Sequence, residues 1–176
     1  DGNTDAGEPK AGATFNNFSG TNAVLGGRLT QGHDGAAISA GERQAAYDYY
    51  ANAEAVDVSL VMCGPADMTV SKHIIDTIAA ERKDCMAFAS PLESSVVNNA
   101  GSERTSTLSD NTDLGSSSYA VMDSAWKYQY CRYRDIFMYV PMNGDTAGLC
   151  ARTDFTNDAW WSPAGMTRGT IKNIVK

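Results

Sequence analysis

Alternating apolar and polar positions in the first half of the chain predict a strand, a helix and a second strand. The first strand covers Val56 to Met62, and a break follows at Cys63–Asp67, where Asp67 is expected to cap the helix. The helix runs from about Met68 to Lys83 and the second strand from Cys85 to Ala89. Such a sequence of elements forms a βαβ unit, whose two strands are parallel.

Each of these elements has an apolar face that is expected to pack in the core. On the first strand this face consists of Val56, Val58, Leu60 and Met62. On the helix it consists of Val70, Ile74, Ile75, Ile78 and Ala79. An earlier helix is expected over about residues 41–53, because Ser39 and Glu42 form a capping-box pattern. Its inward side chains are expected to be Ala45, Ala46, Tyr49 and Tyr50.

The second half of the chain predicts a hairpin and further short elements. Pro91 opens a weak helix to about Asn98, and the polar residues 99–118 predict a surface loop. Strand segments at Tyr119–Met122, Trp126–Cys131 and Ile136–Val140 follow, and an antiparallel hairpin is expected near 119–141.

A last helix and a last strand are expected near the end of the chain. The helix runs from Gly144 to about Thr153, capped by Asn143 or Asp145, and the strand covers Thr170–Val175. The fold class is therefore α/β: a mixed β-sheet with flanking helices, built on one βαβ unit plus an antiparallel hairpin.

Charge and composition exclude several kinds of partner. The chain of 176 residues carries a formal net charge of −7, so it repels nucleic acid phosphates and anionic lipids, and neither nucleic acid nor a membrane is expected as a partner. No apolar run approaches the ~18 residues of a membrane span. Cys63, Cys85, Cys131 and Cys150 form no CxxC pair and are expected to be buried free thiols, as suits a reducing cytosol. No metal or cofactor is expected.

Candidate catalytic groups are few. The only histidines are His33, within a glycine-rich turn, and His73, which is expected on the surface of a helix. Cys63 precedes a helix and is a conceivable nucleophile, but burial is the favoured interpretation. Neither a nucleotide-binding glycine pattern nor a Gly-x-Ser-x-Gly elbow occurs. The aromatic and basic residues between Trp126 and Tyr139 could stack nucleobases, although cross-strand packing is favoured.

The most informative run lies in the last quarter of the chain and has the character of a stiff, packed connector. Its motif residues are Arg152, Asp154, Trp160, Trp161, Ser162, Pro163, Gly165, Arg168 and Gly169. They resemble the ARTD…W.SPAG.NRG run of contractile phage tail sheath proteins, from which Met166–Thr167 departs. The glycine-rich segment between Leu25 and Gly35 is similar to a second run of that family. The tryptophan pair is expected either to fill a gap between helix and last strand or to contact another subunit.

The resemblance implies a structural protein of the phage tail without a catalytic site or cofactor. Tail sheath subunits form hexameric rings around a tail tube, next to baseplate proteins, and contract to drive the tube through the host envelope. The resemblance therefore implies a place in the virion tail and assembly in the host cytoplasm. Sheaths of related contractile injection systems are the nearest alternative. An α/β hydrolase or nucleotide-binding domain, or another tail or baseplate component, are the others.

The ends of the chain carry a further expectation. Residues 1–22 are expected to be a flexible arm or loop, and residues 23–176 a tail-sheath-like α/β domain that contains the loop 99–118. Because the chain lacks an initial Met and stops within an apolar run at Lys176, it is expected to be a fragment without the C-terminal domain. Such a fragment is expected to be monomeric.

Overall fold

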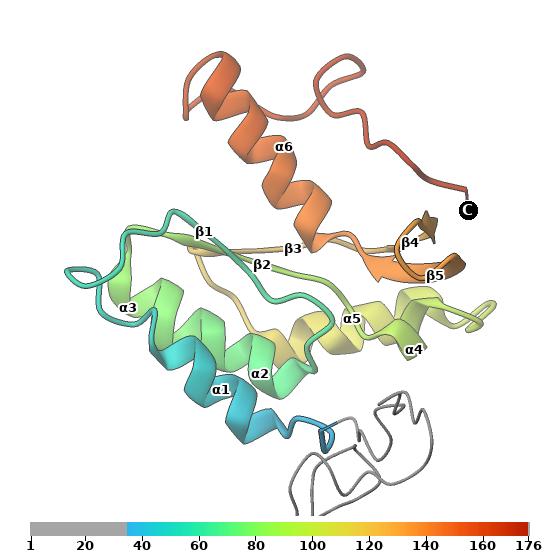
Figure 1. Ribbon diagram of the computed structural model, residues 1–176, viewed down its shortest axis with the longest axis horizontal. Helices are drawn as coiled ribbons and strands as arrows, with labels where there is room; N and C mark the ends of the chain where they lie inside the picture. Colours follow the sequence, from blue (N-terminus) through green and yellow to red (C-terminus); the bar gives the residue numbers. More distant parts are fainter. Residues whose placement is uncertain (1–34, 176) are drawn as a thin grey trace, which may run out of the picture. The chain divides into compact units, whose positions relative to one another are not determined.

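The computed structural model describes residues 35–175 (Figure 1). The chain divides into two units, Asp1–Ala37 and Ile38–Lys176, and nearly all of the described residues belong to the second. The expected arm at residues 1–22, and the glycine-rich segment up to Asp34 with His33, lie outside the described residues.

A parallel three-stranded sheet forms the centre of the second unit. Its strands are β1 (Leu60–Met62), β2 (Met86–Ala89) and β3 (Ala120–Met122), in the order β1-β2-β3. The parallel pairing of β1 with β2 confirms the βαβ unit. The third strand was expected within the antiparallel hairpin, and that prediction is wrong, because β3 pairs parallel with β2. Helices between β2 and β3 return the chain to the same end of the sheet, which is the connection that parallel strands need.

One long helix crosses from β1 to β2 and supplies most of the core. It consists of α2 (Met68–His73), the π-helical turns of η3 (Ile74–Ala79) and α3 (Ala80–Arg82). Asp67 caps it, as expected, by accepting a 2.8 Å hydrogen bond from the Val70 N–H. The whole predicted stripe is buried: Val70, Ile74, Ile75, Ile78 and Ala79. These side chains share one cluster with Ala87 and Ala89 of β2.

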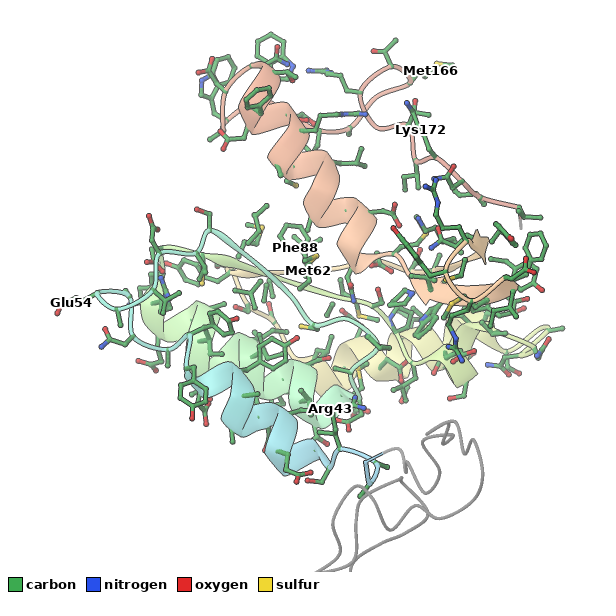
Figure 2. All side chains as sticks on the ribbon, viewed as in Figure 1. Arg43, Glu54, Met62, Phe88, Met166 and Lys172 are labelled. Carbon is green, nitrogen blue, oxygen red and sulfur yellow. The ribbon has the colours of Figure 1, made fainter. Side chains whose placement is uncertain are left out.

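The inward face of β1 is the opposite of the one expected. Val61 and Cys63 are buried on the helical side, whereas Met62 is 50% exposed. Three strand positions in register, Met62, Phe88 and Val121, form a row across the other face. The helix α6 (Asn143–Thr156) lies on that face, with Met62 and Phe88 beneath it (Figure 2). The sheet has apolar residues on both faces, so alternation could not identify the core side of β1.

The first described helix, α1 (Ala40–Asp48), begins with the predicted capping box, in which Ser39 and Glu42 bond each other's backbone N–H. Its inward residue is Tyr47, whose hydroxyl donates a 2.8 Å hydrogen bond to the carbonyl of Met62. The prediction that Ala45, Ala46, Tyr49 and Tyr50 face inward is wrong, because all four are exposed. The helix ends at Asp48, so the two later tyrosines lie beyond its last turn.

Residues 99–118 are not a loop throughout, because they contain the helix α5 (Glu103–Leu114), which follows the short helix α4 (Glu93–Val96). Two buried residues hold α5 in place. Leu114 joins the core cluster, and the Asp110 carboxylate accepts a 3.0 Å hydrogen bond from the Leu92 N–H. A helix anchored by one leucine and one aspartate has no apolar stripe, and the sequence pattern therefore gave no sign of it.

The predicted hairpin is formed by β4 (Trp126–Cys131) and β5 (Ile136–Pro141), paired antiparallel. The helix α6 follows at once, but its N-cap is Met142, and neither Asn143 nor Asp145 caps it. The final strand predicted at 170–175 is not formed. Asn173 has a left-handed backbone there, with φ of 62°, which interrupts an extended conformation.

The helix-on-sheet core makes a direct stability prediction. Replacing the fully buried Ile78 with Ala removes three methyl or methylene groups from the centre of the cluster and leaves a cavity. The free energy of unfolding is expected to fall by about 2–5 kcal/mol in urea denaturation. Glu81→Ala, at an exposed position of the same helix, is the control and should change it by less than about 0.5 kcal/mol. Equal effects of the two substitutions would contradict this description of the core.

Candidate assembly surface

The carboxyl-terminal edge of the parallel sheet is where an α/β enzyme would bind its substrate. Cys63 lies there, and burial raises its pKa to about 11, so the thiol stays protonated at neutral pH. The imidazole of His73 contacts Asp48 through Nε2 at 2.7 Å and Thr77 through Nδ1 at 3.3 Å. Both ring nitrogens are thus engaged on the helix surface, and no thiolate–imidazole pair is formed. Cys85 is buried as expected, whereas Cys131 and Cys150 are only half-buried.

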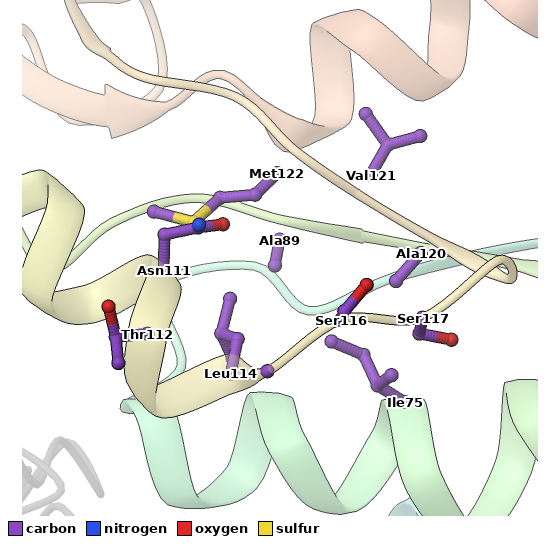
Figure 3. Close-up of a pocket in the computed structure, with 11 residues that line it drawn as sticks. Ile75, Ala89, Asn111, Thr112, Leu114, Ser116, Ser117, Ala120, Val121 and Met122 are labelled. Carbon is purple, nitrogen blue, oxygen red and sulfur yellow. The ribbon is translucent and has the colours of Figure 1, made fainter.

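The cavities near the sheet carry no arrangement suited to catalysis. One cavity of about 460 Å³, between the end of α5 and β3, is lined only by uncharged residues such as Ile75, Asn111 and Ser117 (Figure 3). Another, of about 510 Å³, includes Asp67 and Trp126 in its wall. Asp67 is the helix cap, and the Trp126 indole N–H donates to the carbonyl of Pro91 at 2.8 Å. Within residues 35–175 no cluster of metal-ligating side chains occurs, and no helix is long and apolar enough to cross a bilayer.

Polar side chains at this edge instead join the sheet to the hairpin and to α6. The Ser90 hydroxyl donates a 2.7 Å hydrogen bond to Asp123 and accepts one of 3.0 Å from the backbone N–H of Asn143. The buried Asn143 amide donates to the carbonyl of Gly64 at 2.8 Å. Loops that follow β1, β2 and β3 are therefore tied to the first turn of α6. We call Ser90, Asp123 and Asn143 the junction.

A buried ion pair completes the attachment of α6. The Lys127 ammonium on β4 lies 2.6 Å from a carboxylate oxygen of Asp145 on α6, and the lysine side chain is only 7% exposed. Removing one partner of such a pair leaves an uncompensated charge away from water, which is strongly destabilising. The pair and the junction together fix where α6 begins.

The far end of α6 brings the motif residues together. The Arg152 guanidinium donates to the carbonyl of Arg168. The Arg168 guanidinium lies 5.3 Å from the ring centroid of Trp161, in the range of a cation–π interaction. Asp154 is exposed on the same helix. Arg152, Trp161 and Arg168 are therefore in contact through the segment that follows the helix.

The backbone of Ser162–Gly169 closes into a compact loop. The Ser162 hydroxyl accepts from the Ala164 N–H at 3.2 Å, and the Gly169 N–H donates to the carbonyl of Gly165 at 2.8 Å. Gly165 has φ of 122°, which favours glycine. A Cβ on Gly169 would lie 3.0 Å from the Gly165 carbonyl oxygen and 3.3 Å from that of Pro163. Both glycines are thus required by the loop itself, which explains the spacing of the motif.

Large apolar side chains project from this end of the molecule. Trp160 is 76% exposed and Trp161 40%, with their ring centroids 5.1 Å apart. Phe155, on α6, is 92% exposed, and Met166, on the loop, is 98% exposed (Figure 2). The expectation that the tryptophans fill a gap within the domain is wrong. We call Phe155, Trp160, Trp161 and Met166 the apolar tip.

The aromatic residues of the hairpin pack against each other across the strands. Tyr128 lies 5.6 Å from Phe137 and 4.7 Å from Tyr139, and Tyr130 lies 5.3 Å from Phe137, measured between ring centroids. The favoured interpretation, cross-strand packing, is confirmed.

These features define an α/β structural domain with an exposed contact surface. The tail sheath protein of Enterobacteria phage T4 is 38% identical to the chain over 176 aligned residues, which cover 90% of this chain and 26% of that protein. The tail sheath protein of Vibrio phage KVP40 is 38% identical over 138 residues, 70% of this chain and 20% of that protein. The tail sheath protein of Salmonella phage ViI is 37% identical over 132 residues, 74% of this chain and 21% of that protein.

The chain belongs with the phage tail sheath proteins, and spans about a quarter or a fifth of the length of the relatives that it matches. No protein-family model matches it. The resemblance suggested by the run from Arg152 to Gly169 is confirmed by these matches, which extend over most of the chain.

The junction predicts a pH dependence of stability. Burial raises the pKa of Asp123, although hydrogen bonds from Ser90 and the Ala125 N–H oppose the rise. Because the folded state holds this proton more tightly, the carboxyl contributes most stability at acidic pH. That contribution is lost as the pH rises from the ordinary aspartate range through the raised pKa. Asp123→Asn has no such proton, so wild type minus variant, in free energy of unfolding, is expected to be larger at pH 4 than at pH 7. Urea titrations at both pH values measure it, and the opposite order would refute the assignment.

The loop predicts the effect of a single added methyl group. Gly169→Ala places Cβ against two backbone carbonyls, so the loop must open, at a cost of about 1–3 kcal/mol. Loss of the Arg168–Trp161 contact should change the tryptophan fluorescence and near-ultraviolet circular dichroism. Gly148→Ala is the matched control, because a Cβ there meets nothing within 4 Å, and alanine favours the helix by up to about 1 kcal/mol. Identical spectra for Gly169→Ala and wild type would show that the loop is not closed as described.

Proposed function

We propose that this chain is part of a contractile phage tail sheath subunit. The full subunit polymerises around the tail tube and contracts to drive the tube through the host envelope for genome delivery. The observation that carries the proposal is the 37–38% identity to three phage tail sheath proteins over 70–90% of the chain. Its partners are then other sheath subunits in hexameric rings, the tail tube and the baseplate, in a virion tail assembled in the host cytoplasm.

A mechanical role suits the way the described unit is built. Sheath contraction on this proposal moves subunits as bodies between two sets of contacts, which requires each subunit to keep its shape. The buried Lys127–Asp145 pair and the junction hold α6 to the sheet and hairpin. The proposed subunit has no catalytic role, in keeping with the protonated thiol of Cys63 and the engaged imidazole of His73.

We assign the subunit contact to the motif residues and the apolar tip. Tryptophan, methionine and arginine are enriched in protein interfaces, and buried tryptophans are frequent sites of about 2–4 kcal/mol each. The closed loop at Gly165 and Gly169 holds Trp160 and Met166 in a fixed position, which lowers the entropy lost on association. On this proposal residues 1–22 are an arm, and residues 23–176 are the domain that carries the contact.

The contact is tested in a full-length sheath subunit that carries this sequence. Trp160→Ala removes a largely exposed side chain, so folding should be retained while assembly is lost. A loss of about 1.4 kcal/mol per contact lowers each association constant about tenfold, and far fewer tubes are expected in electron micrographs and light scattering. The chain alone is the reference and should remain monomeric.

Tyr133→Ala is the matched control for that experiment. Tyr133 is an aromatic residue with 91% exposure at the hairpin turn, away from the motif. It should leave tube formation unchanged. Normal tubes from the Trp160→Ala subunit would remove Trp160 from the contact. Failure of the wild-type full-length protein to form tubes at all would instead overturn the proposed function.

A further inference from the structure

The outer edge of the strand β4 has backbone groups that point away from β5. The Val175 N–H donates a 2.9 Å hydrogen bond to the carbonyl of Tyr128, so Tyr128 faces this outer edge. Backbone groups alternate in direction along a strand, so Trp126 and Tyr130 face the same way. The odd-numbered residues face β5, as the hydrogen bond from the Met142 N–H to the carbonyl of Ala125 indicates.

The outer edge of β5 is less suited to a further strand. Tyr139 lies opposite Tyr128 in the register, so Phe137, Tyr139 and Pro141 direct their backbone groups away from β4. Proline has no N–H to donate, and within sheets it is typical of edge strands that are not extended. Of the two edges of the hairpin, only that of β4 has a full set of donors and acceptors.

The segment around Val175 approaches this edge in the direction opposite to β4. Val175 is bonded to Tyr128, near the middle of β4, whereas Asn173 and Ile174 share the wall of a cavity with Cys131 and Tyr133. Later residues of the segment thus lie beside earlier residues of β4. Figure 1 shows the end of the described chain running toward the hairpin.

The left-handed residue Asn173 explains where an added strand would start. Its φ of 62° turns the chain, so residues before it cannot pair with β4 in a continuous ladder. Ile174 and Val175 follow, both β-branched and both exposed. Such residues favour an extended conformation packed on neighbouring strands.

We propose that the outer edge of β4 is an acceptor edge for a third, antiparallel strand, supplied by this same chain from Ile174 onward. The Val175–Tyr128 hydrogen bond is the first of its ladder, and the reciprocal bond joins the Tyr128 N–H to the carbonyl of Val175. A two-stranded hairpin is only marginally stable, and a third strand stabilises it and removes an open edge. The inference goes beyond the proposed function and does not depend on it.

Amide hydrogen exchange of this chain, followed residue by residue by NMR, tests the proposal. Tyr128 is the reporter, and Lys127, which faces β5, reports whether the hairpin itself is intact. Val175→Pro removes the donor and the strand conformation, whereas Val175→Ala, the matched control, keeps both. Exchange at Tyr128 is expected to be at least tenfold faster in Val175→Pro than in wild type or Val175→Ala, with Lys127 unchanged.

Three results would overturn the proposal. The first is fast exchange at Tyr128 in the wild-type chain, which needs no variant to observe. The second is equal protection of Tyr128 in wild type and in Val175→Pro. The third is protection in wild type that disappears on dilution, because a strand from a neighbouring copy would then occupy the edge.

Discussion

The structure depends above all on the close packing of one helix against two alanines of the central strand. Ile74, Ile75 and Ile78 are buried against a sheet whose middle strand presents Ala87 and Ala89 on that side. Small strand side chains let the helix approach closely, and each isoleucine transferred from water contributes about 1.5–3 kcal/mol. The short strands β1, β2 and β3 have few ladder hydrogen bonds of their own. The sheet is therefore stabilised mainly by the helix that crosses it.

From this core, the position of the apolar tip follows by polar interactions rather than by further apolar burial. Asn143 is buried and bonded to two loops at the carboxyl-terminal edge of the sheet. Hydrogen bonds have definite directions, so they fix the angle at which α6 leaves the sheet, which non-directional apolar contact does not do. The helix then spans the distance to the motif loop as one rigid element. A polar junction near the core thus determines where Trp160 and Met166 are presented.

Sequence patterns identified the elements whose own residues determine them, and failed where distant contacts decide. The crossing helix and its cap at Asp67 were predictable, because stripe and capping residue are local signals. The helix α5 was not, because its anchors Asp110 and Leu114 are defined by contacts with other elements. The parallel placement of β3 was missed for the same reason.

The candidate site shows the same division. Membership of the motif could be read from the order and spacing of its residues, and the need for glycine at 165 and 169 is local. The exposure of Trp160 could not, because an aromatic residue in a single sequence is usually expected in the core. Only the tertiary arrangement shows that the closed loop turns this side chain outward.

The charge of the chain gives the exposed tip its significance. Copies with a formal net charge of −7 repel one another at distances beyond contact. Salt screens this repulsion over about 8–10 Å, but it provides no attraction between subunits. In the proposed sheath, attraction must therefore come from short-range contacts, and large apolar side chains supply the greatest gain per residue on leaving water. An acidic surface that keeps subunits apart, together with a few rigidly held apolar residues, restricts association to copies that meet in the correct orientation. That restriction is what an ordered lattice of identical subunits requires.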